Sequence, residues 1–293
     1  MNNNVFVRIA RLLPDKAYLS LKYFKAFGRF PNWNNPKTFT EKLQWLKLYN
    51  RKPEYTTMVD KYAVKAYVAN IIGKEYIIPT LGVWDRPEDI EWDKLPEQFV
   101  LKTTHGGGGE GVVICSNKVS FDRENAIRIL NYSLNTDLYV ISREWPYKNV
   151  PKRIIAEKFL APEKISASKD LLDYKFFCFN GKVKFFKVDF GRFVEHHANY
   201  YSPEGELLEF GEQGLEPDPN YHIEFPTNLS EMVSLAEKLS ANEPFLRVDF
   251  YNVNGKIYFG ELTFYPASGM GRWTSDSVDN EIGRYLRLQN FHH

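Results

Sequence analysis

The chain has 293 residues, of which 43% are hydrophobic and 26% are charged, and its formal net charge is +1. This balance is ordinary for a globular protein and argues against a nucleic-acid-binding protein, which would present a strongly basic surface. The length predicts two or three lobes with a large buried core.

The first residues predict no secretion signal, because the early apolar run is short and contains Arg8 and Arg11. No run reaches the length of a transmembrane helix. Cys115 and Cys178 both lie in apolar segments, without the spacing of a zinc site or a disulfide framework. We therefore expect core thiols in a reducing compartment and a cytoplasmic protein.

Residues 1–30 contain six basic side chains and one acid, Asp15, interleaved with apolar residues. One interpretation is an amphipathic helix that packs on the body of the protein and leaves its lysines in water. The other is a basic amphipathic surface that lies against a polyanionic partner or against anionic lipid, at the inner face of the membrane.

The next elements are a helix, a second helix and a strand. Thr38 and Glu41 have the spacing of a capping box, which predicts a helix start. A helical pattern over residues 60–68 is expected to end near Gly73, and a strand is expected to begin over residues 76–79.

A glycine-rich segment, residues 103–111, separates predicted strands over residues 98–102 and 112–115. Four consecutive glycines, residues 106–109, exceed what a hairpin turn needs, and each costs backbone entropy on ordering. Such a segment suits a loop whose backbone amides wrap a phosphate chain, with Lys102 adding a positive charge. The alternative is a floppy hairpin tip. It is not a Walker loop, because no Gly-Lys-Ser/Thr follows and the glycines lead into a strand.

The middle of the chain predicts a strand over residues 153–160 and a hairpin with strands 173–179 and 182–188. Asn180-Gly181 between those strands is the strongest short-range hairpin signal. Residues 202–218 are acidic and rich in Gly and Pro, which indicates a surface loop. A helix is expected from Leu229 to Ser240.

A second hairpin over residues 245–263 carries the polar residues that are best suited to form a metal-binding or catalytic site. A three-residue loop, 253–255, would pair Asn252 with Lys256. In that register Glu261 lies opposite Arg247, and Asp249 lies opposite Phe259. Arg247, Asp249 and Glu261 would then share one face of the hairpin. A two-residue turn at 254–255 would separate Asp249 from Glu261. The shared face is either a solvated ion-pair network or a Mg²⁺ site, since this ion is typically held by one or two carboxylates and substrate phosphates.

Four segments, taken together, resemble the ATP-grasp fold of D-alanine–D-alanine ligase, carbamoyl-phosphate synthetase and glutathione synthetase: DKYAVKAYV, FVLKTTHGGGGEGVVI, IIAEKFL and RVDFYNVNGKIYFGELTFYPASGM. More specifically, NPKTFTEKLQWLKLYNR, DKYAVKAYV and the RVDFY–ELTF pair resemble the TupA-like ATP-grasp proteins. The resemblance implies an α+β fold in which two lobes grip ATP between antiparallel sheets. We expect a short helical N-terminal region over residues 1–57, a lobe with the glycine-rich flap over 58–160, and a lobe with the Mg²⁺ site over 161–291.

The resemblance also assigns roles to residues around ATP. Lys61 and Lys102 would contact its phosphates, and Asp173 would bind the ribose. The closing flap would consist of His105, Gly106, Gly107, Gly108, Gly109 and Gly111, and the adenine hinge of Glu157, Lys158 and Leu160.

At the reaction centre, the resemblance implies that Asp249 and Glu261 hold one or two Mg²⁺ ions. Thr263 stands where the family usually has an asparagine ligand, which makes the second ion less secure. Arg247, with backbone near Gly269, would stabilise an oxyanion, and Lys102 completes the catalytic set.

The expected activity is ATP-dependent joining of a carboxylate to an amine through an acylphosphate. The resemblance suggests a uronic acid of a capsule or cell-wall glycan as the carboxylate and an amino acid as the amine. Arg192, His196, His197 and Arg272 are candidate substrate-binding residues, or simply polar surface residues beside a loop. An ATP-grasp kinase and a non-catalytic nucleotide- or polyanion-binding module are the rival interpretations.

Overall fold

The computed structural model describes residues 11–288 except 108, 110, 162–170 and 192–194. The chain divides into two compact units. Unit 1 contains Lys52–Ala161, and unit 2 contains Leu13–Arg51 together with the described chain after residue 161. The sequence interpretation separates residues 1–57 from both lobes, whereas residues 13–51 belong to unit 2 and residues 52–57 to unit 1.

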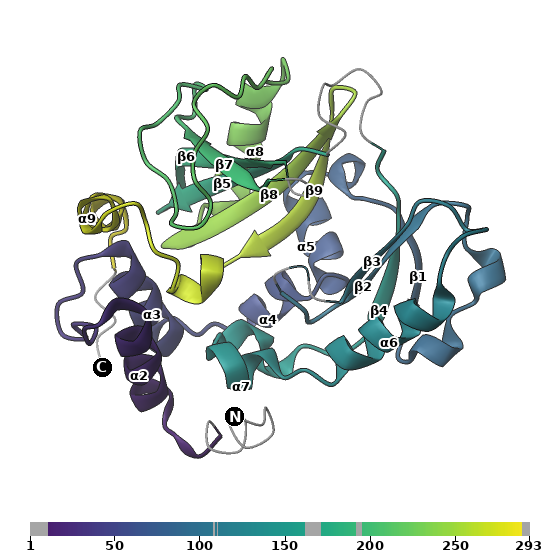
Figure 1. Cartoon of the computed structure of the whole chain (residues 1–293), viewed down its shortest axis with the longest axis horizontal. Helices are drawn as coiled ribbons and strands as arrows, with labels where there is room; N and C mark the ends of the chain where they lie inside the picture. Colours follow the sequence, from purple (N-terminus) through teal and green to yellow (C-terminus); the bar gives the residue numbers. More distant parts are fainter. Residues whose placement is uncertain (1–10, 108, 110, 162–170, 192–194, 289–293) are drawn as a thin grey trace. The chain divides into compact units, whose positions relative to one another are not determined.

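Unit 1 is a four-stranded antiparallel sheet with helices. Its strands are ordered β1-β4-β2-β3, and α6 lies along one face of the sheet (Figure 1). The elements are α4 (Glu54–Val59), α5 (Ala63–Ile72), β1 (Thr80–Trp84), β2 (Phe99–Thr103), β3 (Val112–Cys115), α6 (Arg123–Leu134), α7 (Leu138–Ser142) and β4 (Ile154–Lys158).

The two faces of this sheet differ because side chains alternate along each strand. Phe99 and Leu101 of β2 are fully buried and belong to one core with Leu130 of α6. The intervening Lys102 and, on β4, Glu157 therefore lie on the opposite face. This alternation places the charged residues of unit 1 on the face that α6 does not cover.

Unit 2 is built on a five-stranded antiparallel sheet with the order β7-β6-β5-β8-β9. Helix α8 packs on one face, where Phe176 and Cys178 of β5 are fully buried (Figure 1). The elements are α2 (Asp15–Phe27), α3 (Phe39–Tyr49), β5 (Asp173–Phe179), β6 (Lys182–Phe190), β7 (His197–Tyr201), α8 (Leu229–Ser240), β8 (Phe245–Val253), β9 (Lys256–Thr263) and α9 (Asp276–Tyr285).

The other face of this sheet has an aromatic end and a charged end. Phe39 of α3 packs against Phe179 and Phe245, with ring centroids 5.5 and 5.0 Å apart. Further along the same strands, the residues with the same orientation are charged, beginning with Lys175 on β5 and Arg247 on β8. Helix α3 therefore closes only the aromatic end.

Local sequence signals explain several element boundaries. The Thr38–Glu41 capping box is confirmed at the start of α3, and α8 has the predicted bounds. The predicted strand over residues 76–79 is wrong, because Lys74–Tyr76 forms a short 3₁₀ helix and β1 begins at Thr80. Pro79 has no backbone N–H to donate to a strand ladder, so the strand starts after it. Within the described part of the chain, no helix is long and apolar enough to cross a membrane.

Candidate active site

The β8–β9 hairpin turns through two residues, Asn254 and Gly255, and pairs Val253 with Lys256. Both turn residues have positive φ, 54° and 76°. This is the geometry of a type I′ turn, which matches the twist of the flanking strands and favours Asn-Gly. The predicted three-residue loop, with Asn252 paired to Lys256, is therefore wrong.

A bulge at Gly260 restores the shared face that this turn alone would have destroyed. The register shifts between Asp249 and Phe250, so that Asp249 lies directly opposite Glu261 and Arg247 opposite Thr263. The predicted pairings of Glu261 with Arg247 and of Asp249 with Phe259 are wrong. The predicted shared face is nevertheless confirmed, because the extra residue shifts every later side chain of β9 by one position.

Arg247 connects the two carboxylates on this face. Its Nε donates a hydrogen bond of 2.7 Å to Asp249, and its Nη2 donates to Asp249 at 2.6 Å and to Glu261 at 2.9 Å. The Thr263 hydroxyl lies 3.4 Å from the same Glu261 oxygen. The Asp249 side chain is 3% exposed, whereas that of Glu261 is 38% exposed and can meet a ligand.

The charged end of the sheet carries an excess of negative charge. Among the described residues, three cations and five carboxylates are linked there by ion pairs or, between Asp173 and Asp249, by an electrostatic interaction. The members are Asp173, Lys175, Lys187, Asp189, Glu212, Arg247, Asp249 and Glu261.

The pKa of Asp249 is raised in this cluster. Burial is the largest cause, the nearby Asp173 and Glu261 charges add to it, and together they raise the pKa to about 7 against the opposing effect of Arg247. A buried carboxylate whose ionised form is disfavoured gains when a cation binds. Two carboxylates also supply the hard oxygen ligands that Mg²⁺ prefers. The residues present therefore fit Mg²⁺, although the described residues contain no group of three or more His, Cys, Asp or Glu arranged around a metal position.

Most of the unit 2 residues that were predicted to bind the ribose or the substrate form hydrogen bonds with other residues of the chain. Lys175 Nζ donates to Asp173 at 2.6 Å, His196 Nε2 donates to Asp189 at 3.0 Å, and His197 Nδ1 donates to the Glu216 carbonyl at 2.9 Å. Arg272 Nε donates to the Ala26 carbonyl at 2.8 Å, at the end of α2. Arg192 lies outside the described residues. The substrate-binding roles stay predictions.

In unit 1, Glu157 lies between two lysines. Its carboxylate is 2.6 Å from the Lys102 ammonium and 2.5 Å from that of Lys65. Burial opposes ionisation of Glu157, but the charges of Lys102 and Lys65 outweigh it and lower its pKa. Burial also lowers the pKa of Lys65. Glu157, a predicted hinge residue, thus holds Lys102, a predicted phosphate-binding residue, by an ion pair. Of the other two predicted hinge residues, Lys158 is exposed at the end of β4 and Leu160 is half-buried.

The glycine-rich segment is tied to the start of α5. Lys61 Nζ donates a hydrogen bond to the Gly106 carbonyl, and the Lys61 amide donates to the Thr104 carbonyl at 3.0 Å. Gly109 and Gly111 have positive φ, and a Cβ on Gly111 would come within 2.3 Å of the Ser133 hydroxyl. Gly107 is described and half-buried, whereas Gly108 lies outside the described residues.

His105 is buried at the base of this segment. Its side chain is 4% exposed, and Nε2 donates to the Ser133 carbonyl at 3.1 Å. Burial, followed by the Lys152 charge, lowers the pKa of His105. The ring is therefore a neutral anchor for the loop, and its predicted contact with nucleotide stays a prediction.

Sequence reasoning missed three buried lysines beside the predicted residues: Lys65, Lys175 and Lys187. A signal for two of them was present. Lys175 follows Asp173 by two residues and Lys187 precedes Asp189 by two, so each pair shares one strand face in an otherwise apolar segment. Lys65 had no local signal, because its partner Glu157 is 92 positions away in the sequence.

A family model described as TupA-like ATPgrasp matches residues 41–287. No curated protein sequence matches the chain.

Similar solved structures include two ligases and a carboxylase domain. D-alanine–D-alanine ligase from Bacillus anthracis, complexed with ATP, is 18% identical over 71% of this chain and 54% of its own, with a TM-score of 0.40. L-amino acid ligase from Bacillus licheniformis is 14% identical over 92% and 56%, with a TM-score of 0.46. The biotin carboxylase domain of Hydrogenobacter thermophilus 2-oxoglutarate carboxylase, with MgADP and bicarbonate, is 15% identical over 80% and 47%, with a TM-score of 0.41. The chain thus spans about half the length of these three proteins.

Proposed function

Because the chain belongs to the TupA-like ATP-grasp family, we propose that it is an ATP-dependent carboxylate–amine ligase. The single observation that carries this proposal is the Asp249–Glu261 pair on neighbouring strands, bridged by Arg247 and set in a cluster of charged residues. Such a cluster suits a divalent cation that accompanies nucleotide phosphates.

The proposed reaction proceeds in two steps. A carboxylate oxygen of the first substrate attacks the γ-phosphorus of ATP, and ADP leaves with the electron pair of the broken P–O bond. The nitrogen of a neutral amine then attacks the acyl carbon, the acyl C–O bond breaks, phosphate leaves with that electron pair, and the nitrogen loses a proton. For an amine that arrives as an ammonium ion, the products are ADP, phosphate, an amide and one proton.

The protein residues act mainly by positioning and by electrostatics, which is what phosphoryl transfer requires. In unit 1, Lys61 and Lys102 bind phosphate oxygens, Glu157 holds Lys102 in place, and the glycine-rich segment supplies backbone amides.

In unit 2, Asp249 and Glu261 would hold Mg²⁺, and Thr263 lies beside Glu261 as a further oxygen donor. The ion would neutralise charge on the transferred phosphoryl group. Arg247 orients both carboxylates and, with the backbone near Gly269, stabilises the developing oxyanion. Asp173 binds the ribose.

The finer proposal concerns the substrates. The carboxylate is a uronic acid in a surface polysaccharide of the capsule or cell-wall type, free or polymer-linked, and the amine is an amino acid. Arg192, His196, His197 and Arg272 would contact the anionic partner. Residues up to 30 would bring the protein to the inner face of the membrane, which the outward apolar side chains of α2 support.

ADP release tests the proposal directly. Wild-type protein with ATP and Mg²⁺ is expected to release ADP only when both a uronic acid and an amine are present, and the product mass should equal acid plus amine minus water. ADP release with a phosphorylated sugar as product would identify the rival kinase. No turnover with any acid and amine would favour a non-catalytic binding module.

A further inference from the structure

A short strained turn, residues Pro266–Gly269, follows β9 in unit 2. Strand β9 ends at Thr263, directly opposite Arg247, and the turn begins three residues later. Three successive residues of the turn, 267–269, have φ of 47°, 56° and 60°, a conformation that residues other than glycine rarely adopt. Only the last of them is glycine, so the surrounding structure must hold the turn in this shape.

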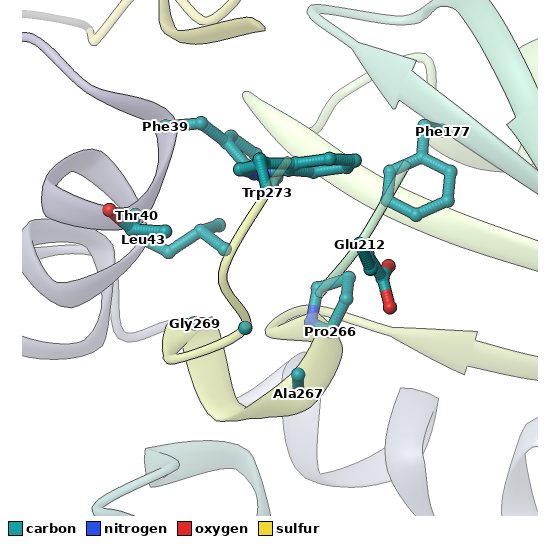
Figure 2. Close-up of a pocket in the computed structure, with 10 residues that line it drawn as sticks. Phe39, Thr40, Leu43, Phe177, Glu212, Pro266, Ala267, Gly269 and Trp273 are labelled. Atoms are coloured by element: carbon teal, nitrogen blue, oxygen red, sulfur yellow. The ribbon is translucent and has the colours of Figure 1, made fainter. Parts of the chain in front are cut away.

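Two side chains of α3 hold the turn. Lys47 Nζ donates to the Ser268 carbonyl at 2.7 Å and to the Ser268 hydroxyl at 2.9 Å. Gln44 Nε2 donates to the Gly269 carbonyl at 2.7 Å. Figure 2 shows Gly269 beside Leu43 of the same helix, where both line a small pocket. The contact is close, because a Cβ on Gly269 would lie 2.5 Å from Gln44 Nε2.

Both of these α3 side chains are fully buried. Burying an ammonium or an amide group is costly unless its hydrogen bonds are made. The Gln44 carbonyl oxygen is buried without a hydrogen-bond partner among the described residues, and such an atom destabilises a fold. Stability alone therefore does not explain why α3 directs the donors of Lys47 and Gln44 at this turn.

Lys47 acts on the peptide group that contains the Gly269 N–H. The Ser268 carbonyl, which accepts from the ammonium, belongs to that same peptide group. A hydrogen bond to a carbonyl oxygen polarises its peptide group and strengthens the attached N–H as a donor. The proposed function assigns the oxyanion to the backbone near Gly269, so Lys47 would strengthen a donor at that place.

Gln44 acts on the next peptide group along the chain. The Gly269 carbonyl, which accepts from Gln44, shares this group with the Met270 N–H. That N–H closes the turn by donating to the Ala267 carbonyl at 3.0 Å. Gln44 therefore strengthens the hydrogen bond that gives the turn its shape.

We propose that Lys47 and Gln44 are positioning residues for the second chemical step, in which the amine attacks the acyl carbon. They fix the turn so that its backbone meets the oxyanion that develops in this step. The inference rests on the proposed ligase function. The first step, attack on the γ-phosphorus of ATP, forms no oxyanion at the acyl carbon and should not depend on the turn.

Lys47→Met tests the inference, because it keeps the length of the side chain and removes its donor. The first step is measured without amine, using glucuronic acid and ATP that carries heavy oxygen in its β–γ bridge. The label moves to a non-bridging β position each time the acylphosphate forms and reverts. The second step is measured as kcat/KM for alanine, from ADP release at limiting alanine. If glucuronic acid or alanine is inactive, the acid and amine that support ADP release replace them.

For Lys47→Met we expect kcat/KM for the amine to fall at least about tenfold, while the label exchange stays within about twofold of wild type. Lys238→Met, which replaces an exposed lysine of α8 in the same unit, should match wild type in both measurements. If Lys47→Met does not fold, Gln44→Met removes the other donor and is expected to show the same separation of the two steps.

An unchanged kcat/KM for the amine would overturn the inference, as would an equal fall in label exchange and kcat/KM. Loss of folding in both variants would also overturn it, because the two residues would then be purely structural. Failure of the ligase function has a separate signature: wild-type protein would show neither label exchange nor ADP release with any acid and amine.

Discussion

Replacing Glu157 with glutamine should destabilise unit 1 strongly at neutral pH. The carboxylate is 5% exposed and lies within 2.6 Å of two ammonium groups, those of Lys65 and Lys102. Removing one partner of a buried ion pair leaves uncompensated charge and typically costs about 3–5 kcal/mol. Lys65, whose pKa is already lowered by burial, can lose its proton and recover part of that cost, so we expect about 3 kcal/mol.

The pH dependence of this loss follows from the direction of the Glu157 shift. Because its pKa is lowered in the folded protein, its contribution is present above the ordinary glutamate pKa and is lost as pH falls through the folded value. Wild type and Glu157→Gln should therefore converge in acid.

Urea unfolding of the full chain, followed by tryptophan fluorescence at neutral and acid pH, measures this difference. Glu97→Gln, on the exposed surface of the same unit, is the matched control and should behave like wild type. The assignment of Glu157 as the counter-charge of the two lysines would be refuted if the free energies of unfolding of Glu157→Gln and wild type differed by less than about 1 kcal/mol at neutral pH. A difference that small is on the scale of surface substitutions.

Three further changes test other parts of the molecule. The pKa of Asp249 is raised from 3.8 to about 7, so the folded state holds this proton more tightly than the unfolded state. The free energy of unfolding should therefore fall as pH rises from about 4 to 7, by at most roughly 4 kcal/mol. In urea unfolding without metal, the free energy of unfolding of Asp249→Asn should depend less on pH than that of wild type, and an equal pH dependence would contradict the shift. Gly269→Ala puts a Cβ 2.5 Å from Gln44 Nε2, at a residue with positive φ, and should lower the free energy of unfolding in urea by about 1–3 kcal/mol, whereas an unchanged value would contradict the close packing of this turn against α3. Leu21 and Phe24 of α2 are 53% and 47% exposed, so replacing both with serine should reduce sedimentation with anionic vesicles, and equal sedimentation would remove α2 as the membrane contact.

Features set by neighbouring residues were predictable from the sequence. The Asn180-Gly181 hairpin formed with both turn residues at positive φ, and α8 and the capping box of α3 have the predicted positions. These features depend on short-range backbone preferences and on the two-residue period of a strand.

Features set by distant residues were not predictable. The bulge at Gly260 depends on how β9 pairs with β8, and a Cβ there would come within 3.1 Å of the Asp249 carbonyl, which glycine avoids. The pairing of Lys65 with Glu157 joins a helix to a distant strand. Likewise, nothing local indicates that residues 13–51 pack with the C-terminal unit, where α3 completes a pocket.

Magnesium-dependent ADP release by Glu261→Gln tests the central claim most directly. This change removes one negative charge from the most exposed carboxylate of the pair while keeping its shape. We expect at least about a hundredfold loss of kcat, by the scale of lost charge stabilisation at a reaction centre, with a raised Mg²⁺ requirement. Glu224→Gln, an exposed control in the same unit, should be unaffected. Wild-type rates and Mg²⁺ dependence in Glu261→Gln would contradict the account.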